Sequence, residues 1–209
     1  DTGGDETFGN ITFVDSAAVK LHSAAGTNGD LFIDAGTDLA VGGNLSITAT
    51  TGNITQGAAV VVTGTTTLKA TTSNDITLDN ASNDFQGAVK ITTGNDVTLV
   101  DANAIDLGVS AVSGTYAVTA TSGNITDSGD LTITGAATFI TVATGSHIIL
   151  DASGNAFAAA VTMRAGNGSN AAFGNITFVD SAAVKLHSSA GTNGDLFIDA
   201  GTDLAVGGN

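Results

Sequence analysis

The chain has 209 residues, with 28 Gly and no Pro, Cys or Trp. Its 20 acidic and 5 basic residues give a net charge of -15, which argues against nucleic acid or an anionic membrane surface as partner, because both attract basic proteins. Without Cys, the chain cannot form a disulfide scaffold, a thiol nucleophile or a Cys-ligated zinc site. Hydrophobic residues make up 42%, which is too many for a disordered chain and predicts a folded core.

The chain repeats itself over a long distance. Residues 8–44 read FGNITFVDSAAVKLHSAAGTNGDLFIDAGTDLAVGGN, and residues 173–209 repeat this string with one change, Ala24 to Ser189. Because both ends lie in repeated sequence, we expect one continuous solenoid segment over residues 1–209, cut from a longer fibre or able to stack end to end. No basic segment followed by an apolar run opens it, so we expect no signal peptide here, and no apolar run is long enough for a spanning helix.

A shorter repeat lies inside the long one. Its signature is Gly or Asn, then Asn or Asp, then an aliphatic anchor, and usually Thr, as in residues 9–12 (GNIT) and 74–77 (NDIT). The nine anchors are Ile11, Leu31, Ile54, Ile76, Val97, Ile125, Ile148, Ile176 and Leu196. The intervals from Ile11 to Ile176 fill the 165-residue period, so we expect seven coils per long repeat and one column of stacked anchors.

Each unit alternates apolar and polar residues with a period of two, which is typical of strands with one buried face. Around Ile54, for example, we expect strands over residues 53–56, 59–63 and 66–70. Equivalent strands of successive units stack best if each unit is one turn of a solenoid. The sequence therefore predicts an all-β fold, a right-handed single-stranded parallel β-helix with three short strands per coil of about 20–28 residues.

Gly, Asn, Asp and Ser lie between the expected strands. These residues tolerate left-handed backbone angles, so we expect such angles at the corners of the coils. Two units are longer than the rest. Their extra residues fall near 108–116 and 165–173, and we expect both segments to protrude as loops.

With three-strand coils, GNIT-type corners and Thr-rich outer positions, the chain resembles the filamentous haemagglutinin-like proteins, which are giant bacterial surface or secreted proteins. The resemblance covers the whole chain and implies a right-handed parallel β-helix, an extracellular or cell-surface location, and a role in adhesion or fibres. The Asn-Pro motifs of that family's secretion domain are missing, since the chain has no Pro. The resemblance implies no catalytic residues.

Aspartates follow most anchors by two to four residues, and in a solenoid they would line one edge. Carboxylates in such a row are possible calcium ligands. Solvated corner residues are the alternative, because two carboxylates ~4.8 Å apart in water repel by only ~0.9 kcal/mol. The unit of Ile54 has Gln56 in place of the aspartate. The candidate ligands are Asp15, Asp34, Asp79, Asp101, Asp151, Asp180 and Asp199.

Other chemistry is less well supported. His147 takes the place of the usual corner Asn or Asp, so it is better explained as a turn residue than as a general base. Thr48 and Thr119 begin Thr-x-Thr pairs at matching offsets from their anchors, an arrangement that could bind ice, although intervening units break the array. We expect no enzyme activity and no cofactor other than possible calcium.

The sequence thus favours a structural or adhesive module of a long extracellular filament or surface fibre, whose partner is another copy of itself. The alternative is an adhesin that binds a carbohydrate or a host or neighbour-cell protein through the two expected loops, near Tyr116 and Phe173.

Overall fold

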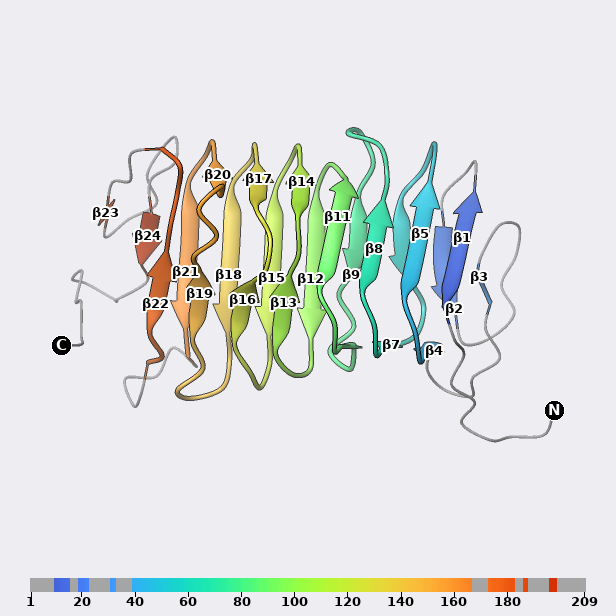
Figure 1. Cartoon of the computed structure of the whole chain (residues 1–209), viewed down its shortest axis with the longest axis horizontal. Helices are drawn as coiled ribbons and strands as arrows, with labels where there is room; N and C mark the ends of the chain where they lie inside the picture. The colour runs from blue at the N-terminus through green and yellow to red at the C-terminus, as the bar shows by residue number, and fades with distance from the viewer. Residues whose placement is uncertain are drawn as a thin grey trace.

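The computed structural model describes residues 10–15, 19–22, 31–32, 39–166, 173–182, 186–187 and 196–198. Within this part of the chain all regular structure is β-strand, and every paired strand is parallel to its neighbour. The strands lie across a rod, with β1 near one end and β22 near the other (Figure 1). The fold is a parallel β-solenoid, as the sequence predicts.

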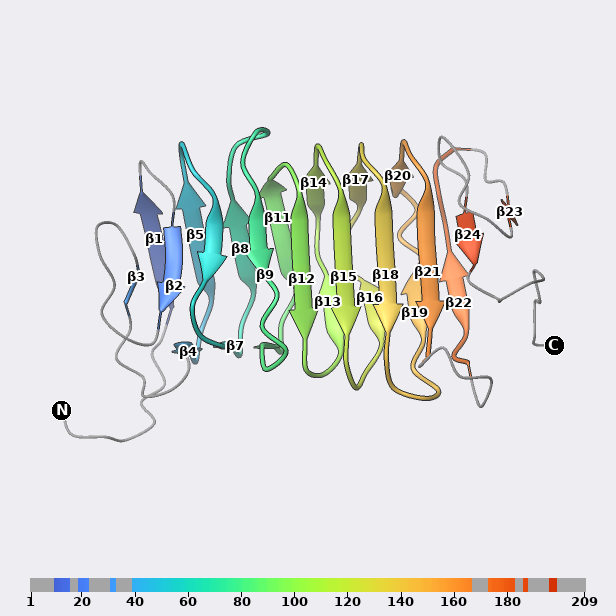
Figure 2. The same cartoon turned by 180° about the vertical axis from the view of Figure 1, so that it is seen from behind.

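Two long sheets form opposite faces of the rod, which are seen from its two sides in Figures 1 and 2. The first long sheet runs in the order β1 (Ile11–Asp15), β5 (Leu45–Ala49), β8 (Thr66–Lys69), β11 (Val89–Thr93), β13 (Ile105–Leu107), β16 (Ile125–Asp127), β19 (Ile148–Leu150), β22 (Ile176–Phe178). The second long sheet runs in the order β3 (Leu31–Phe32), β2 (Val19–His22), β6 (Ile54–Gln56), β9 (Ile76–Leu78), β12 (Val97–Asp101), β15 (Tyr116–Ala120), β18 (Ala137–Thr141), β21 (Val161–Ala165), β24 (Leu196–Ile198), β23 (Leu186–His187).

Two short side sheets supply the third strand of most coils. The first contains β4 (Leu39–Val41), β7 (Val60–Val62) and β10 (Asp84–Phe85). The second contains β14 (Ser110–Val112), β17 (Leu131–Ile133) and β20 (Ala156–Phe157). In Figure 1, β4 and β7 lie along the lower edge of the rod, and β14, β17 and β20 lie along the upper edge. The third strand therefore changes edges partway along the molecule.

This change of edge reflects an exchange of the two long sheets. In the first half, a side strand leads the chain from the second long sheet into the first, as β7 leads from β6 to β8. In the second half, a side strand leads from the first long sheet into the second, as β17 leads from β16 to β18. In the second half, therefore, the two long sheets have exchanged roles, and so have the two edges. A half-turn about the rod axis produces this same exchange. The solenoid thus consists of half-repeats related by a two-fold screw.

Because the long sheets exchange roles between the two halves, the nine predicted anchors are divided between them. Ile54, Ile76 and Val97 are register partners in the second long sheet. Ile125, Ile148 and Ile176 are register partners in the first, which also contains Ile11. Leu31 and Leu196 lie in strands of the second long sheet. The predicted single column is therefore wrong, because each half-repeat presents its anchors on the opposite face.

Few of the described corner glycines use the left-handed backbone that we predicted. In the described part of the chain, Gly145 and Gly166 are the glycines with positive φ, at 76° and 116°. Most corner glycines are instead needed because successive corners touch. A Cβ on Gly64 would lie 2.6 Å from the Gly43 carbonyl oxygen, and one on Gly87 would overlap the Gly64 carbonyl. Their small size, and not their conformational freedom, is what the stacking of coils requires.

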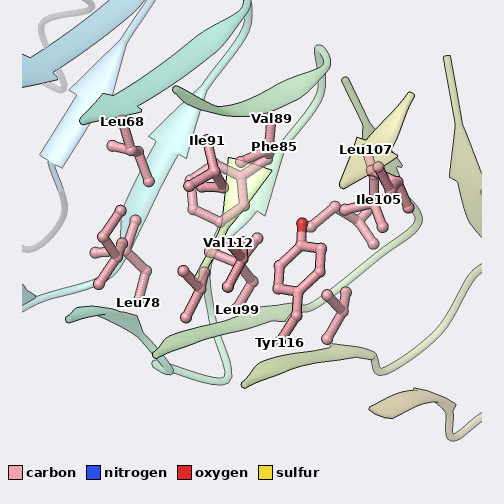
Figure 3. Packing of buried hydrophobic residues seen from close by; sticks show 14 of the residues in the cluster. Leu68, Leu78, Phe85, Val89, Ile91, Leu99, Ile105, Leu107, Val112 and Tyr116 are labelled. Carbon is pink, nitrogen blue, oxygen red and sulfur yellow. The ribbon is translucent and has the colours of Figure 1, made fainter. Parts of the chain in front are cut away.

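Apolar side chains fill the space between the sheets. Alternate residues of β5, β12 and β15 are buried, which matches the predicted period of two. In the second half the core also holds an aromatic row. Tyr116 meets Phe139 at 5.8 Å, Phe139 meets Phe157 at 6.1 Å, and Phe157 meets Phe178 at 5.2 Å between ring centroids. Figure 3 shows Tyr116 surrounded by Leu99, Ile105, Leu107 and Val112.

The segment over residues 108–116 does not protrude as we predicted. It contains β14, whose Ser110 and Val112 are buried, and it ends at Tyr116, which is fully buried. The extra residues of this unit therefore begin the second side sheet. In the other long unit, residues 167–172 lie outside the described part of the chain, and the adjoining Phe173 is 51% exposed.

Candidate functional site

Corner side chains link each coil to the next. The oxygen Oδ1 of Asn53 accepts the backbone N–H of Asp75 at 2.9 Å, Oδ1 of Asp75 accepts that of Asp96 at 3.2 Å, and Oδ1 of Asp96 accepts that of Thr115 at 2.7 Å. These three N–H groups belong to residues just before the strands, where the hydrogen bonds between neighbouring strands do not satisfy every donor. The Asn or Asp before each anchor therefore satisfies a donor of the following coil.

The same arrangement recurs in the second half with a histidine inserted. Oδ1 of Asn124 accepts the His147 backbone N–H, and Nδ1 of His147 accepts the Asn175 backbone N–H, both at 2.8 Å. The predicted role of His147 as a substitute for a corner Asn or Asp is confirmed. Its Nδ1 is occupied as an acceptor, which leaves that atom unavailable for proton abstraction in this arrangement.

An asparagine is buried at a corresponding place in each half-repeat. Oδ1 of Asn83 accepts the Val60 N–H at 2.9 Å and Nε2 of Gln56 at 2.7 Å, while its Nδ2 donates to Oε1 of Gln56 at 3.0 Å. In the other half, Oδ1 of Asn155 accepts the Leu131 N–H at 2.8 Å and its Nδ2 donates to Asp127 at 2.7 Å. Both asparagines are fully buried, and their backbone carbonyls accept the N–H groups of Ala102 and Ser181, respectively, so each asparagine links three coils.

Asp101 terminates the first side sheet. Its Oδ2 accepts the Phe85 N–H at 2.7 Å and its Oδ1 accepts the Asn103 N–H at 2.6 Å. Phe85 lies in β10, the last strand of that sheet, so the carboxylate takes the position of the missing next strand. Asp180 does the same for the second side sheet, where Oδ1 accepts the N–H of Phe157 in β20 at 3.4 Å.

Burial makes Asp101 easier to protonate. Desolvation raises the pKa of Asp101 from 3.8 to about 6, although the Phe85 and Asn103 N–H groups act in the opposite direction. The nearby carboxylate of Asp84 adds to the rise. The folded protein therefore holds this proton more tightly than the unfolded chain does. The stability that comes from the neutral form is complete below pH 3.8 and is lost as the pH rises through about 6.

We expect Asp101→Asn to change the pH dependence of stability. The difference between 3.8 and about 6 sets an upper limit of about 3 kcal/mol on the gain of the variant over the native protein between pH 4 and pH 7. Asn has one acceptor oxygen where the carboxylate has two, so the variant also loses one of the bonds from Phe85 and Asn103 at every pH, and only the pH-dependent difference reports the lost charge. Urea unfolding at several pH values measures this difference. Asp79→Asn, which alters an exposed side chain, controls for the loss of one charge. If Asp101→Asn changed the free energy of unfolding by the same amount at pH 4 and at pH 7, the prediction would be wrong.

The candidate calcium ligands do not form one edge. Asp79 follows a strand of the second long sheet and Asp101 ends another. Asp15, Asp151 and Asp180 end or follow strands of the first long sheet. Asp101 is buried and accepts backbone donors, whereas Asp151 is exposed. The predicted single row is wrong for the same reason as the single column of anchors. Asp34 and Asp199 lie outside the described residues.

The structure also separates other residues that the sequence grouped. Thr48 lies in β5 of the first long sheet and Thr119 in β15 of the second, so they do not share a face that could bind ice. Tyr116 is fully buried and cannot contact a ligand. Among the described residues, no cluster of three or more His, Asp or Glu side chains is placed to hold a metal ion, and no helix is long and apolar enough to cross a membrane.

Sequence reasoning did not identify the capping role of Asp101 and Asp180. The available signal is a five-residue motif, Ile or Val, Thr, Phe or Leu, Val, Asp. It occurs at residues 11–15, 97–101 and 176–180, in strands β1, β12 and at β22. In the described part of the chain the second and third copies mark the place where a side sheet ends.

Comparison with known families agrees with this division. A family described as "Repeats of unknown function (DUF5649)" matches residues 8–92 and again residues 94–164. Each match begins three residues before the motif strand, at Ile11 and at Val97. No curated protein and no solved structure matches the chain. Since the two matches span most of the sequence, the chain belongs to the DUF5649 repeat family.

Proposed function

We propose that the chain is a structural, non-catalytic module of a long extracellular filament or surface fibre. The observation that supports this most directly is continuity: the first long sheet pairs without interruption from β1 to β22. The two copies Ile11 and Ile176 occupy the edge strands of that one sheet, seven strand steps apart. A further repeat can therefore continue the same rod without a change of direction.

The surface and the core fit this role. The net charge of -15 opposes side-by-side aggregation of rods, which long parallel sheets would otherwise favour. The corner ladders hold coil to coil with side chains as well as backbone. Haemagglutinin-like bacterial surface proteins, which the chain resembles in repeat style, would place such a fibre outside the cell.

Electron microscopy of a polypeptide with increasing numbers of the 165-residue period tests the structural role. Each added period should lengthen a straight rod by roughly 34 Å, because seven strand steps of ~4.8 Å separate the copies. Compact particles or flexible beads would contradict the proposal. An antibody against the chain should label the surface of intact source cells, and labelling only after lysis would refute the extracellular location.

Ligand binding by an adhesin is the competing function. Of the two aromatic residues named for it, Tyr116 is buried and Phe173 is half exposed, while residues 167–172 of the expected loop lie outside the described part of the chain. Replacing Phe173 with Ala separates the two functions. A structural module should keep its rod length and its interaction with cells, whereas an adhesin of this kind should lose attachment and keep the rod.

A further inference from the structure

Several asparagines of the chain begin the tripeptide Asn-x-Ser or Asn-x-Thr. This tripeptide is the acceptor sequence for N-linked glycans in secreted proteins, and we call it the acceptor tripeptide. The corners of a solenoid favour Asn for structural reasons too, so the tripeptide by itself does not identify a glycosylated residue. In the described part of the chain the tripeptide begins at Asn10, Asn44, Asn53, Asn80, Asn124 and Asn175.

Asn53 uses only one half of its side-chain amide. Oδ1 of Asn53 accepts the Asp75 N–H at 2.9 Å and Nδ2 of Asn74 at 3.4 Å. Its own Nδ2 donates to no residue in the described part of the chain, and the side chain is exposed. Asn124 is arranged in the same way: Oδ1 accepts the His147 N–H at 2.8 Å, and Nδ2 has no acceptor among the described residues. In both residues the nitrogen that would carry a glycan is available.

Corner asparagines that do not begin an acceptor tripeptide use this nitrogen instead. Nδ2 of Asn74 donates to Oδ1 of Asn53, and Nδ2 of Asn95 donates to Oδ1 of Asp75 at 3.0 Å. The second residue after each of them is aliphatic, where the tripeptide requires Ser or Thr. The corner asparagines are therefore of two kinds. Asn74 and Asn95 bind the preceding coil through Nδ2, whereas Asn53 leaves its Nδ2 without a protein partner.

The hydroxyl that completes the tripeptide lies on the outer face of the rod. Thr55 is the second residue of β6 and follows Asn53 by two positions. Residues two apart in an extended chain point to the same side, and the intervening Ile54 is fully buried. Asn53 and Thr55 consequently both point outward. The same sequence, GNIT, surrounds Asn124, so its tripeptide has the same arrangement.

The corner ladder tolerates a substituent on Nδ2. The two corners after Asn53 have Asp75 and Asp96, whose Oδ1 atoms accept the N–H groups of Asp96 and Thr115. A carboxylate has no Nδ2, so the ladder requires only an acceptor oxygen, and a glycosylated amide keeps its oxygen. Asp75 follows Asn53 and His147 follows Asn124 in the next coil. Neither of these can carry an N-linked glycan, so the adjoining corner leaves room for a bulky group.

We propose that Asn53 and Asn124 are N-glycosylation sites. The donor is a sugar activated as a phosphate ester and used by a glycosyltransferase of the source cell. A bond forms between sugar C1 and Nδ2 while the bond from C1 to the phosphate oxygen breaks. The phosphate leaves with the bonding electron pair, and Nδ2 gives up one proton to a base. This modification deepens the proposed function and rests on its extracellular location, since it assigns the surface chemistry of the fibre.

Mass spectrometry of the protein isolated from its source cells tests the two sites. Cleavage before aspartate residues releases residues 38–74 and 106–126, and fragmentation of these peptides locates any added mass. Most copies of Asn53 and Asn124 should carry a glycan, whereas Asn74, in the same peptide as Asn53, should carry none. An unmodified residue at either position overturns the assignment of that position. Absence of glycan from both overturns the proposal, whatever other residues carry.

Three variants made in the source cells separate glycosylation from the hydrogen-bond ladder. Asn53→Asp keeps an acceptor oxygen and removes Nδ2, and Thr55→Val keeps Asn53 and removes the hydroxyl. Each should lower the mass of the protein by one glycan and leave Asn124 modified. Thr55→Ser restores the tripeptide and should keep the glycan. If the glycan at Asn53 persisted in Thr55→Val, attachment would not depend on the tripeptide and the proposal would be wrong.

The location of the protein is measured separately from its mass, by antibody labelling of intact cells. Protein that is labelled at the surface but unmodified at both sites overturns the glycosylation sites and leaves the fibre function standing. Labelling only after lysis refutes the extracellular function, whatever the mass. Failure of the sites and failure of the proposed function are therefore distinguishable.

Discussion

Replacing Asn83 with Ala should lower the free energy of unfolding by about 3–5 kcal/mol. The fully buried amide bonds the Val60 N–H, the Gln56 side chain and the carbonyls of Leu78 and Val100, at 2.7 to 3.2 Å. Its removal leaves these polar groups without partners in the core, where each unpaired group is costly. Urea unfolding followed by far-ultraviolet circular dichroism measures the loss.

Two further variants show whether bonding or volume is responsible. Asn83→Leu restores most of the volume without the hydrogen bonds, so it should be about as destabilising as Asn83→Ala. Asn53→Ala removes a corner amide that is exposed and accepts the Asp75 N–H, and it should cost about 1 kcal/mol or less. If Asn83→Leu restored native stability, the hydrogen bonds would not be the source of the effect.

Replacing Phe139 with Ala should cost a similar amount, about 3–5 kcal/mol, through loss of apolar burial and the cavity left behind. The ring is fully buried between Tyr116 and Phe157, and meets them edge to face at 83° and 87°. Chemical denaturation gives the magnitude. Tyr116 is the only Tyr and the chain has no Trp, so near-ultraviolet circular dichroism reports directly on this part of the core.

The neighbouring residue provides the matched control. Ile140 lies on the outer face of β18 and is half-buried, so Ile140→Ala should cost about 1 kcal/mol and leave the Tyr116 signal unchanged. Equal losses for the two variants would mean that the aromatic row contributes nothing beyond ordinary strand packing.

The parallel solenoid was predictable because its signals are local. Alternation in β5 and β12 specifies which side chains face inward, and regular spacing of anchors specifies that coils stack. The sheet to which a strand belongs is not a local property. The same four residues, GNIT, precede and begin β6 and β16, yet β6 lies in the second long sheet and β16 in the first. The sheet depends on which half-repeat the strand occupies, and no single corner encodes that.

The candidate site residues show the same limit. Asp79 and Asp101 follow their anchors at similar distances, but Asp79 is exposed, whereas Asp101 replaces a missing strand. Only the surrounding coils distinguish the two. Gln56 was correctly singled out as a substitute for an aspartate, since its partnership with Asn83 matches that of Asp127 with Asn155. What the substitution accomplishes became visible only when residues 27 apart were brought together.

The alternation of the side sheets also determines the shape of a long array. A coil with a third strand has more backbone at one edge than at the opposite edge. If all coils of a stack were oriented alike, we would expect this difference to curve the stack in one direction. Here the wide edge lies on one side for β4, β7 and β10 and on the other for β14, β17 and β20. We therefore expect the two curvatures to oppose each other within a 165-residue period, so that an array of such periods runs straight.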